Sequence, residues 1–446
     1  MNACALALGE QPLTLAQLDT CLHQPLHVTI TPAARARVAT GRTWVEQLMH
    51  RGDAIYGINT GFGHLKSKRI ADTQLDELQE NLLLSHAVGV GTPTPPAIVR
   101  WVLLFKLHML LRGHSGVRPE VVDTLAAWLN HDLLPVVPTR GSLGASGDLA
   151  PLAHLFLPLL GRGEFETPAG RQPAAAALAA AGLAPLHLAA KEGLALINGT
   201  QFMLSYAAHV AVRAARLADL ADLIVCMSLE GIRGSVRPAD ERLANLRPHP
   251  GAQRTAANIR RHMQGSEILA SHQHHCDRVQ DAYSFRCAPQ VHGAFRDALA
   301  HFADTVEREL NSVTDNPVLF DGDAVSGGNF HGAPLALTLD YICMALADLS
   351  SIAERRIYAL LSGEGDLPKL LMLDTGLNSG FMLPQYTAAA LVNECKVLST
   401  PACVDSIPTS LGQEDHVSMG ATSALKCFEV LDRAETVLAI ELMCAA

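Results

Sequence analysis

The stretch "GAFRDALAHFADTVERELNSV" (residues 293–313) decides the fold class of this chain. Its apolar side chains recur at steps of three and four residues, which places them on one face of an α-helix. Asp304 and Arg308 lie one turn apart on the other side, where opposite charges support an exposed helix surface. The pattern therefore predicts a long helix with one buried face.

Similar periodic runs fill the second half of the chain, at about 202–230, 334–362, 384–399 and 415–445. Pro334 and Pro384 stand where a first helical turn tolerates proline. Shorter helices are expected near 14–23, 32–50, 73–88 and 95–113, and a surface hairpin or loop at 161–173. No alternating strand–helix series is present, which argues against a doubly wound sheet. We expect a mainly α protein, with an irregular N-terminal region (1–195) followed by a bundle of long helices (196–446).

The composition describes a globular protein with extensive buried surface, since 49% of the 446 residues are hydrophobic and 17% are charged. The formal net charge is −10 without any Lys/Arg block, so neither nucleic acid nor an anionic membrane is an expected partner. The ten cysteines are scattered without a CxxC pair, which favours reduced thiols and a cytoplasmic location. Neither a signal peptide at the N-terminus nor a membrane span in the Ala-rich segment 174–190 is expected.

The glycine-rich stretch "GSLGASGDLAPLAHL" (141–155) precedes an apolar, helix-like run. One interpretation is structural: Ser146 or Asp148 caps a helix and the glycines let the chain turn before it. A nucleotide phosphate loop is disfavoured, because the terminal Gly-Lys-Ser/Thr is missing. A chemical interpretation is that the Gly147 nitrogen attacks the Ala145 carbonyl carbon, since only glycine offers so unhindered a nitrogen. Loss of two water molecules would then leave an electrophilic methylidene carbon.

The stretch resembles the signature of the aromatic amino acid ammonia-lyases and aminomutases, whose Ala-Ser-Gly triplet forms a 4-methylidene-imidazol-5-one (MIO) group. Eight further segments resemble family blocks in the family's order: "YGINTGFG" (56–63), "NLLLSHAVGVG" (81–91), "KEGLALINGTQ" (191–201), "VQDAYSFRCAPQVHGA" (279–294), "TDNPVLF" (314–320), "SGGNFHG" (326–332), "LNSGFM" (377–382) and "SLGQEDHVSMG" (410–420). The resemblance implies an ammonia-lyase with the long-helix fold of that family. The MIO group would be formed from Ala145, Ser146 and Gly147, and Asp148 would assist ring closure.

The implied reaction needs an electrophile for the amino group and a base for the β-proton. Tyr56 is the candidate base, provided that the site lowers its pKa from ~10; taken alone it would be a packing residue. Arg286 suits the substrate carboxylate, because its planar fork donates two charge-assisted bonds, although most single arginines form surface ion pairs.

The resemblance assigns roles to four other residues. It implies that Asn198 and Tyr283 support the electrophile, that Gln280 contributes to substrate binding, and that Phe330 packs nearby.

Ser85, His86 and Glu414 bear on the choice of substrate. The Ser-His pair matches members that act on histidine, and a carboxylate can accept a hydrogen bond from an imidazole N–H. Each has a simpler explanation, His86 as a surface residue and Glu414 as a helix cap. We expect conversion of L-histidine to trans-urocanate; tyrosine or phenylalanine ammonia-lyase activity and an aminomutase remain alternatives. A helical scaffold without activity would not explain the joint presence of these residues.

The resemblance also implies a homotetramer whose active sites draw residues from several subunits. The C-terminal end is shorter than is usual for the family. The histidine-rich "SHQHHC" (271–276) resembles a metal cluster, but adjacent histidines seldom satisfy ligand geometry. We therefore expect no metal, pyridoxal phosphate, flavin or nucleotide cofactor.

Overall fold

The structure is a computed structural model that describes residues 3–51, 54–61, 63, 68–272 and 278–446. The chain divides into two compact units, each discontinuous in sequence. The first unit comprises residues 1–209, 305–337 and 402–424, and the second comprises 210–304, 338–401 and 425–446. Each unit is therefore built from three separate stretches of the chain. The division into regions 1–195 and 196–446 stays a prediction.

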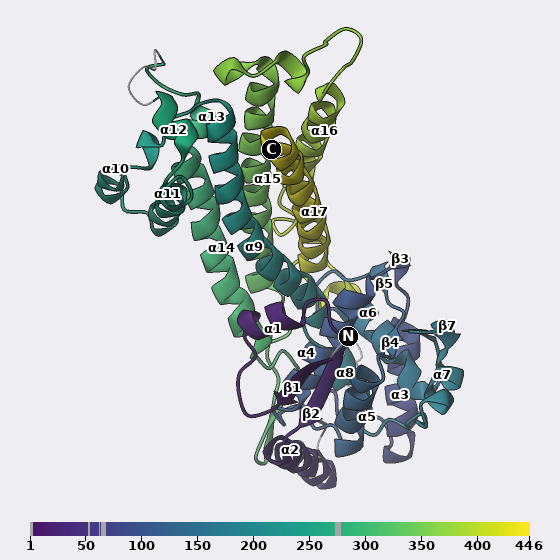
Figure 1. The fold of residues 1–446 in the computed structure, drawn as a ribbon. Helices are drawn as coiled ribbons and strands as arrows, with labels where there is room; N and C mark the ends of the chain where they lie inside the picture. Colours follow the sequence, from purple (N-terminus) through teal and green to yellow (C-terminus); the bar gives the residue numbers. More distant parts are fainter. Residues whose placement is uncertain (1–2, 52–53, 62, 64–67, 273–277) are drawn as a thin grey trace. The chain divides into compact units, whose positions relative to one another are not determined.

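Short helices and four small sheets build the first unit (Figure 1). Its helices are α1 (Leu15–Cys21), α2 (Pro32–His50), α3 (Leu75–His86), α4 (Pro96–Leu110), α5 (Pro119–Asn130), α6 (Leu149–Phe156), α7 (Ala174–Ala180) and α8 (Glu192–Ile197). Its strands are β1 (Cys4–Leu8), β2 (Leu26–Ile30), β3 (Val90–Pro93), β4 (Leu134–Pro135), β5 (Pro138–Arg140), β6 (Glu164–Thr167), β7 (Gly170–Pro173), β8 (Val318–Phe320) and β9 (Asp323–Val325). Strands β1 and β2 pair in parallel, and the other pairs are antiparallel.

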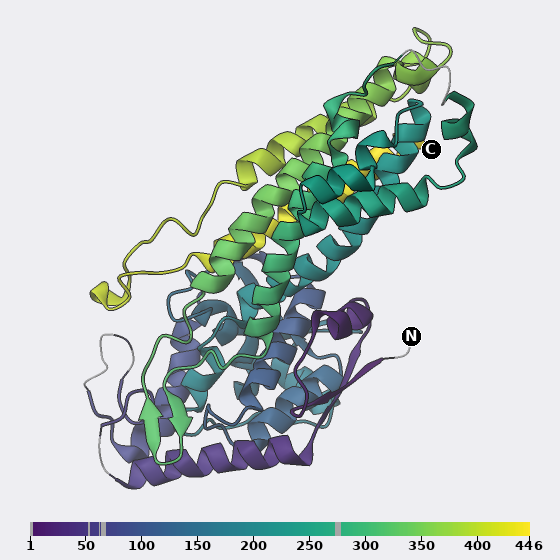
Figure 2. The same ribbon diagram turned by 90° about the vertical axis from the view of Figure 1, so that its left-hand side faces the viewer.

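Local sequence explains several of these elements. Thr14 caps α1 in a reciprocal capping box with Gln17, and Thr31 caps α2 with Pro32 at its first position. The hairpin β6–β7 confirms the prediction for residues 161–173. The hairpin β8–β9 lies beside α2 (Figure 2), where the Leu319 side chain joins a small apolar core.

Long helices form the second unit, as the 3.6-residue periodicity predicts. They are α9 (Gln201–Gly231), α14 (Ala288–Leu310), α15 (Ala333–Ser362), α16 (Met382–Leu398) and α17 (Gly420–Ala445), of which α9, α14, α15 and α17 begin or end in the first unit. Shorter helices accompany them: α10 (Glu241–Leu246), α11 (Pro250–His262), α12 (Glu267–His272) and α13 (Tyr283–Arg286). Single 3-10 turns occupy Asp72–Gln74, Leu157–Leu160, Arg237–Ala239, Glu364–Asp366, Lys369–Leu371 and Ser410–Gly412.

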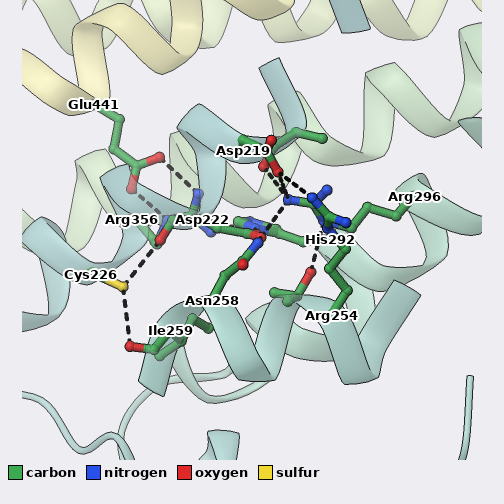
Figure 3. Close-up of polar contacts among 12 residues, drawn as sticks. Asp219, Asp222, Cys226, Arg254, Asn258, Ile259, His292, Arg296, Arg356 and Glu441 are labelled. Carbon is green, nitrogen blue, oxygen red and sulfur yellow. Dashed lines mark hydrogen bonds and ion pairs between the residues drawn. The ribbon is translucent and has the colours of Figure 1, made fainter. Parts of the chain in front are cut away.

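A network of buried charges joins four long helices of the second unit, α9, α14, α15 and α17 (Figure 3). Asp222 of α9 accepts hydrogen bonds from His292 of α14 at 2.9 Å, and Arg356 of α15 pairs with Glu441 of α17 at 2.5 and 2.8 Å. The His292 Nε2 atom lies 3.4 Å from a nitrogen of Arg356. Helices whose apolar faces pack together are therefore also tied by ionic groups.

Helix α15 is long and apolar enough to cross a membrane by length and composition, with a window of mean hydropathy 1.5. More than half of that window, 56%, is buried in the fold. The core of a helical bundle accounts for such a helix equally well. The Ala-rich segment at 174–190 forms only the seven-residue helix α7.

The expectation that all cysteines are reduced is wrong for one pair. A disulfide joins Cys4 of β1 to Cys21 of α1, whose Cα atoms lie 5.5 Å apart. Composition gave no signal for this pair, because the two residues meet only when β1 pairs beside β2. Free cysteines among the described residues include 226, 287, 343, 395, 427 and 444.

Candidate active site

The triplet Ala145–Ser146–Gly147 lies in the loop between β5 and α6 of the first unit. Gly147 has a φ of +76°, and a Cβ atom placed on it would come within 2.2 Å of the Gly199 carbonyl oxygen. A single parallel bridge pairs Gly147 with Gly199, and the Asp148 N–H donates to the Gly199 oxygen at 2.8 Å. The fold therefore requires glycine at the position whose nitrogen must be unhindered.

Asp148 stands at the N-cap position of α6 without capping it through its side chain. Its buried carboxylate instead accepts hydrogen bonds from Ser142 Oγ at 2.7 Å and from the Met203 N–H at 2.9 Å. Burial raises the pKa of this carboxyl group to about 6, although those hydrogen bonds oppose the shift. The capping interpretation is therefore wrong, and Asp148 is a group beside the triplet that can carry a proton near neutral pH.

Ser146 contacts Glu414 from a segment far along the chain. The Ser146 hydroxyl donates to Glu414 Oε1 at 3.0 Å, and Thr409 donates to Glu414 Oε2 at 2.8 Å. The segment is held on the triplet loop by the Met419 N–H, which donates to the Leu143 oxygen at 2.8 Å. Helix α17 begins only at Gly420, so Glu414 is not its cap.

A cavity of about 690 Å³ opens beside this loop. Five predicted site residues line it together: Tyr56, His86, Ser146, Asn198 and Glu414. The Asn198 side chain is buried, and its Oδ1 atom has no hydrogen-bond partner among the described residues. A buried amide oxygen without a partner is rare in folded proteins, which indicates that Asn198 Oδ1 accepts a hydrogen bond from a group bound in the cavity.

Tyr56 lies in a turn, and its hydroxyl oxygen accepts a hydrogen bond from the Gly63 N–H at 3.5 Å. Burial raises the pKa of this phenol, and the negative charges of Glu414 and Asp315 raise it further. The surroundings within the first unit therefore favour the neutral phenol. A base at this position needs an additional cation or hydrogen-bond donor to lower the pKa of the phenol.

His86 ends α3, with its Nδ1 atom 3.0 Å from the Ser85 hydroxyl. Burial lowers the pKa of the imidazole, while a contact with the Leu82 backbone and the charge of Glu414 oppose the shift. A neutral imidazole at the cavity can donate or accept one hydrogen bond, as recognition of a second imidazole requires.

The other predicted residues divide between the two units. Gln280, Tyr283 and Arg286 belong to the second unit, where the Arg286 guanidinium bonds to the Gln280 amide oxygen and lies 4.9 Å from the centre of the Tyr283 ring. Arg356 supports this group from inside the bundle by donating to the Ser284 carbonyl oxygen at 3.3 Å. Phe330 lies half-buried in the turn before α15 and is not among the cavity-lining residues.

Several residues at the cavity carried no role in the sequence interpretation. Lys68 and Asn81 line the cavity. Lys106 of α4 does not line it but donates a hydrogen bond to the carbonyl oxygen of the lining residue Asn198 at 2.5 Å. The signal for Lys106 was available, because it is a charged residue inside the apolar run "WVLLFKLHMLL" (101–111).

The histidine-rich segment 271–276, at which no metal is expected, cannot be placed in the same way. Residues 273–277 lie outside the described residues. Elsewhere, across the part of the chain that the structure describes, no group of three or more His, Cys, Asp or Glu side chains could hold a metal ion.

Comparison with known proteins supports the resemblance. The family model described as aromatic amino acid lyase matches residues 13–446. The chain is 53% identical to a histidine ammonia-lyase of Gloeobacter violaceus, covering 100% of this chain and 86% of that protein. The histidine ammonia-lyase structure from Trypanosoma cruzi matches with a TM-score of 0.90 at 40% identity, covering 99% of this chain and 84% of that one. The tyrosine aminomutase from Streptomyces globisporus matches with a TM-score of 0.93 at 35% identity, covering 99% and 87%.

Proposed function

Since the chain belongs to the aromatic amino acid lyase family, we propose that it is a carbon–nitrogen lyase that converts L-histidine to trans-urocanate and ammonia. The cavity carries this proposal, because Tyr56, His86, Ser146, Asn198 and Glu414 converge on it from separate segments. The relatives named histidine ammonia-lyase, at 53% and 52% identity in Gloeobacter violaceus and Deinococcus radiodurans, support the choice of substrate.

The triplet fits the MIO group that the family implies. Gly147 has no room for a side chain, Ser146 faces the cavity, and the unpartnered Asn198 oxygen lies beside them. Formed from Ala145, Ser146 and Gly147, the group would supply an electrophile that takes up the substrate amino group. Asp148, whose pKa is raised to about 6, is placed to exchange protons during ring closure.

The other residues would bind and orient the substrate. Glu414 presents a carboxylate that can accept the imidazole N–H, and His86 offers a second, neutral partner. Tyr56 would remove the β-proton, and its raised pKa means that it needs a nearby cation to do so. Arg286 would bind the carboxylate through its planar fork and supply that positive charge.

Arg286, Gln280 and Tyr283 belong to the second unit, and we propose that they complete a cavity of another subunit in a homotetramer. Mixing inactive Tyr56→Phe with inactive Arg286→Ala subunits tests this. Reassembled mixtures should regain part of the wild-type activity, because some cavities then hold both native residues. Mixtures that assemble and stay as inactive as either variant would contradict shared sites.

The reaction itself is tested by following ultraviolet absorbance with histidine, tyrosine and phenylalanine. We expect the rise of a conjugated acrylate with histidine alone, and an intact protein mass lower than the sequence mass by two water molecules. Ser146→Ala should abolish both while leaving the fold intact. A full sequence mass, or turnover of tyrosine in preference to histidine, would contradict the proposal.

An aminomutase is the second candidate, because a tyrosine aminomutase shares the fold with a TM-score of 0.93. Product analysis separates the two, since a mutase releases a β-amino acid in place of free ammonia. We propose a cytoplasmic location, which the buried free thiols of Cys226, Cys343, Cys395 and Cys427 support and the single Cys4–Cys21 disulfide among the described residues does not.

A further inference from the structure

Lys106 is a buried charge next to the cavity that has no role in the proposed reaction. The side chain is fully buried on α4, and its ammonium donates to the Asn198 carbonyl oxygen at 2.5 Å. Among the described residues no carboxylate lies within ion-pair distance of it. The carboxylate of Asp315, which faces it, is bound to Lys191 at 2.8 Å.

A lysine in this position lowers the free energy of unfolding, because burial removes its charge from water. Burial lowers the pKa of Lys106 to about 7; Asp315 and Asp148 raise it, and Lys191 lowers it. Methionine or leucine would fill the same volume without that desolvation cost. The sequence around Lys106 is otherwise apolar, so the charge is an exception within its own helix.

The Asn198 carbonyl oxygen, to which Lys106 donates, belongs to the segment 198–199 that contacts the triplet. Asn198 follows α8 at its C-cap position, and the next residue, Gly199, pairs with Gly147 and accepts a hydrogen bond from the Asp148 N–H at 2.8 Å. Gly199 also has a φ of +127°, so this segment has few backbone alternatives. A shift of the Asn198 carbonyl would therefore move both the Asn198 amide and the backbone of Gly199 that contacts Gly147.

We propose that Lys106 is a positioning residue, whose buried ammonium clamps the Asn198 carbonyl and so holds residues 198–199 against the triplet in the geometry needed for ring closure and turnover. The inference rests on the proposed function. A single charged hydrogen bond suits this task, because it is shorter and stronger than a neutral one in a site without water.

The test is Lys106→Met, studied by intact mass, thermal unfolding and steady-state kinetics on the full chain. We expect a smaller fraction of chains with the two-water deficit. The kcat per cyclised chain should fall by about tenfold or more, since small misplacements of site groups are costly. The KM should change little and the melting temperature should be retained or raised. Lys106→Gln, which keeps an N–H donor, should recover part of both losses.

Leu103→Ala is the matched control, because Leu103 is equally buried on α4 and its side chain has no donor that could bond the Asn198 carbonyl. It should lower the melting temperature and leave the two-water deficit intact. A Lys106→Met protein with full deficit and wild-type kcat would overturn the inference. The inference would also be overturned if the deficit and kcat fell only together with the melting temperature, as a loss of stability would cause. It would equally be overturned if Lys106→Gln recovered neither the deficit nor kcat. Wild-type protein without the deficit would instead refute the proposed function.

Discussion

Two buried polar clusters, one in each unit, are satisfied to very different degrees. In the second unit, Glu441 accepts hydrogen bonds from two nitrogens of Arg356 and from the Ser228 hydroxyl. Asp222 accepts hydrogen bonds from His292 and Asn258 (Figure 3). In the first unit, Lys106 has no carboxylate of its own, and the buried Oδ1 of Asn198 and Oε1 of Gln201 have no partners among the described residues. A complete network ties helices together, whereas an incomplete one leaves groups free for a substrate.

The largest effect should follow from breaking the complete network. Arg356→Met removes a fully buried guanidinium and leaves the carboxylate of Glu441 buried without its counter-charge. We expect the free energy of unfolding to fall by about 3–5 kcal/mol, because an uncompensated buried charge is costly. Urea unfolding followed by circular dichroism measures the change. A loss below 1 kcal/mol would show that the network is not a structural element.

The next effect compares two buried asparagines, one in each cluster. Asn198→Ala should lower kcat by about 10²–10³-fold, the range for losing one preorganised polar group, while the fold keeps its stability because Oδ1 has no partner to lose. Asn258 donates to Asp222 at 2.8 Å, so Asn258→Ala should cost about 1–3 kcal/mol in stability and little in kcat. Equal effects of the two substitutions on stability would remove the distinction between the clusters.

The same contrast separates what could be predicted from sequence. Periodicity predicts α14 and α15 closely, because a buried face repeats every 3.6 residues whatever it packs against. Family blocks identify residues at the cavity, since these residue types and their order reflect chemistry. Neither signal indicates that Lys106 meets Asn198, or that Cys4 meets Cys21, because those contacts exist only once distant segments pack. The periodicity predicts the start of α17 five residues too early, because apolar residues such as Val417 and Met419 are buried in the loop that docks on the triplet.

Two buried carboxylates should give opposite pH dependence. The folded-state pKa of Asp148 is raised to about 6, so the stability that its proton contributes is lost as pH rises from about 4 to 6, by on the order of 3 kcal/mol. Urea unfolding of wild type and Asp148→Asn at pH 4.0 and pH 7.5 should show this loss in the wild type only.

Asp222 supplies the contrast. Burial alone would raise the pKa of its carboxyl group, but the hydrogen bond and charge of His292, together with Arg296 and Asn258, outweigh burial and hold the pKa below its ordinary value. Its contribution is therefore present above the unfolded-state pKa and is lost as pH falls through the folded-state value. The Asp222→Asn variant should therefore be less stable than the wild type at neutral pH, and the difference in free energy of unfolding should shrink only at acid pH. If the stability difference between wild type and Asp148→Asn changed with pH in the same direction as that for Asp222→Asn, the opposite pKa shifts of the two carboxyl groups would be contradicted.

The smallest effect is expected at an ion pair that belongs to neither cluster. Arg35 and Asp123 lie 2.5 Å apart, but their side chains are 54% and 36% exposed. Arg35→Met makes the same chemical change as Arg356→Met, yet water can solvate the carboxylate left behind, so the cost should be about 0–1 kcal/mol and should shrink further in salt. If both substitutions cost the same in urea unfolding, charge pairing alone would explain the second-unit network. Burial would then no longer distinguish a structural cluster from a functional one.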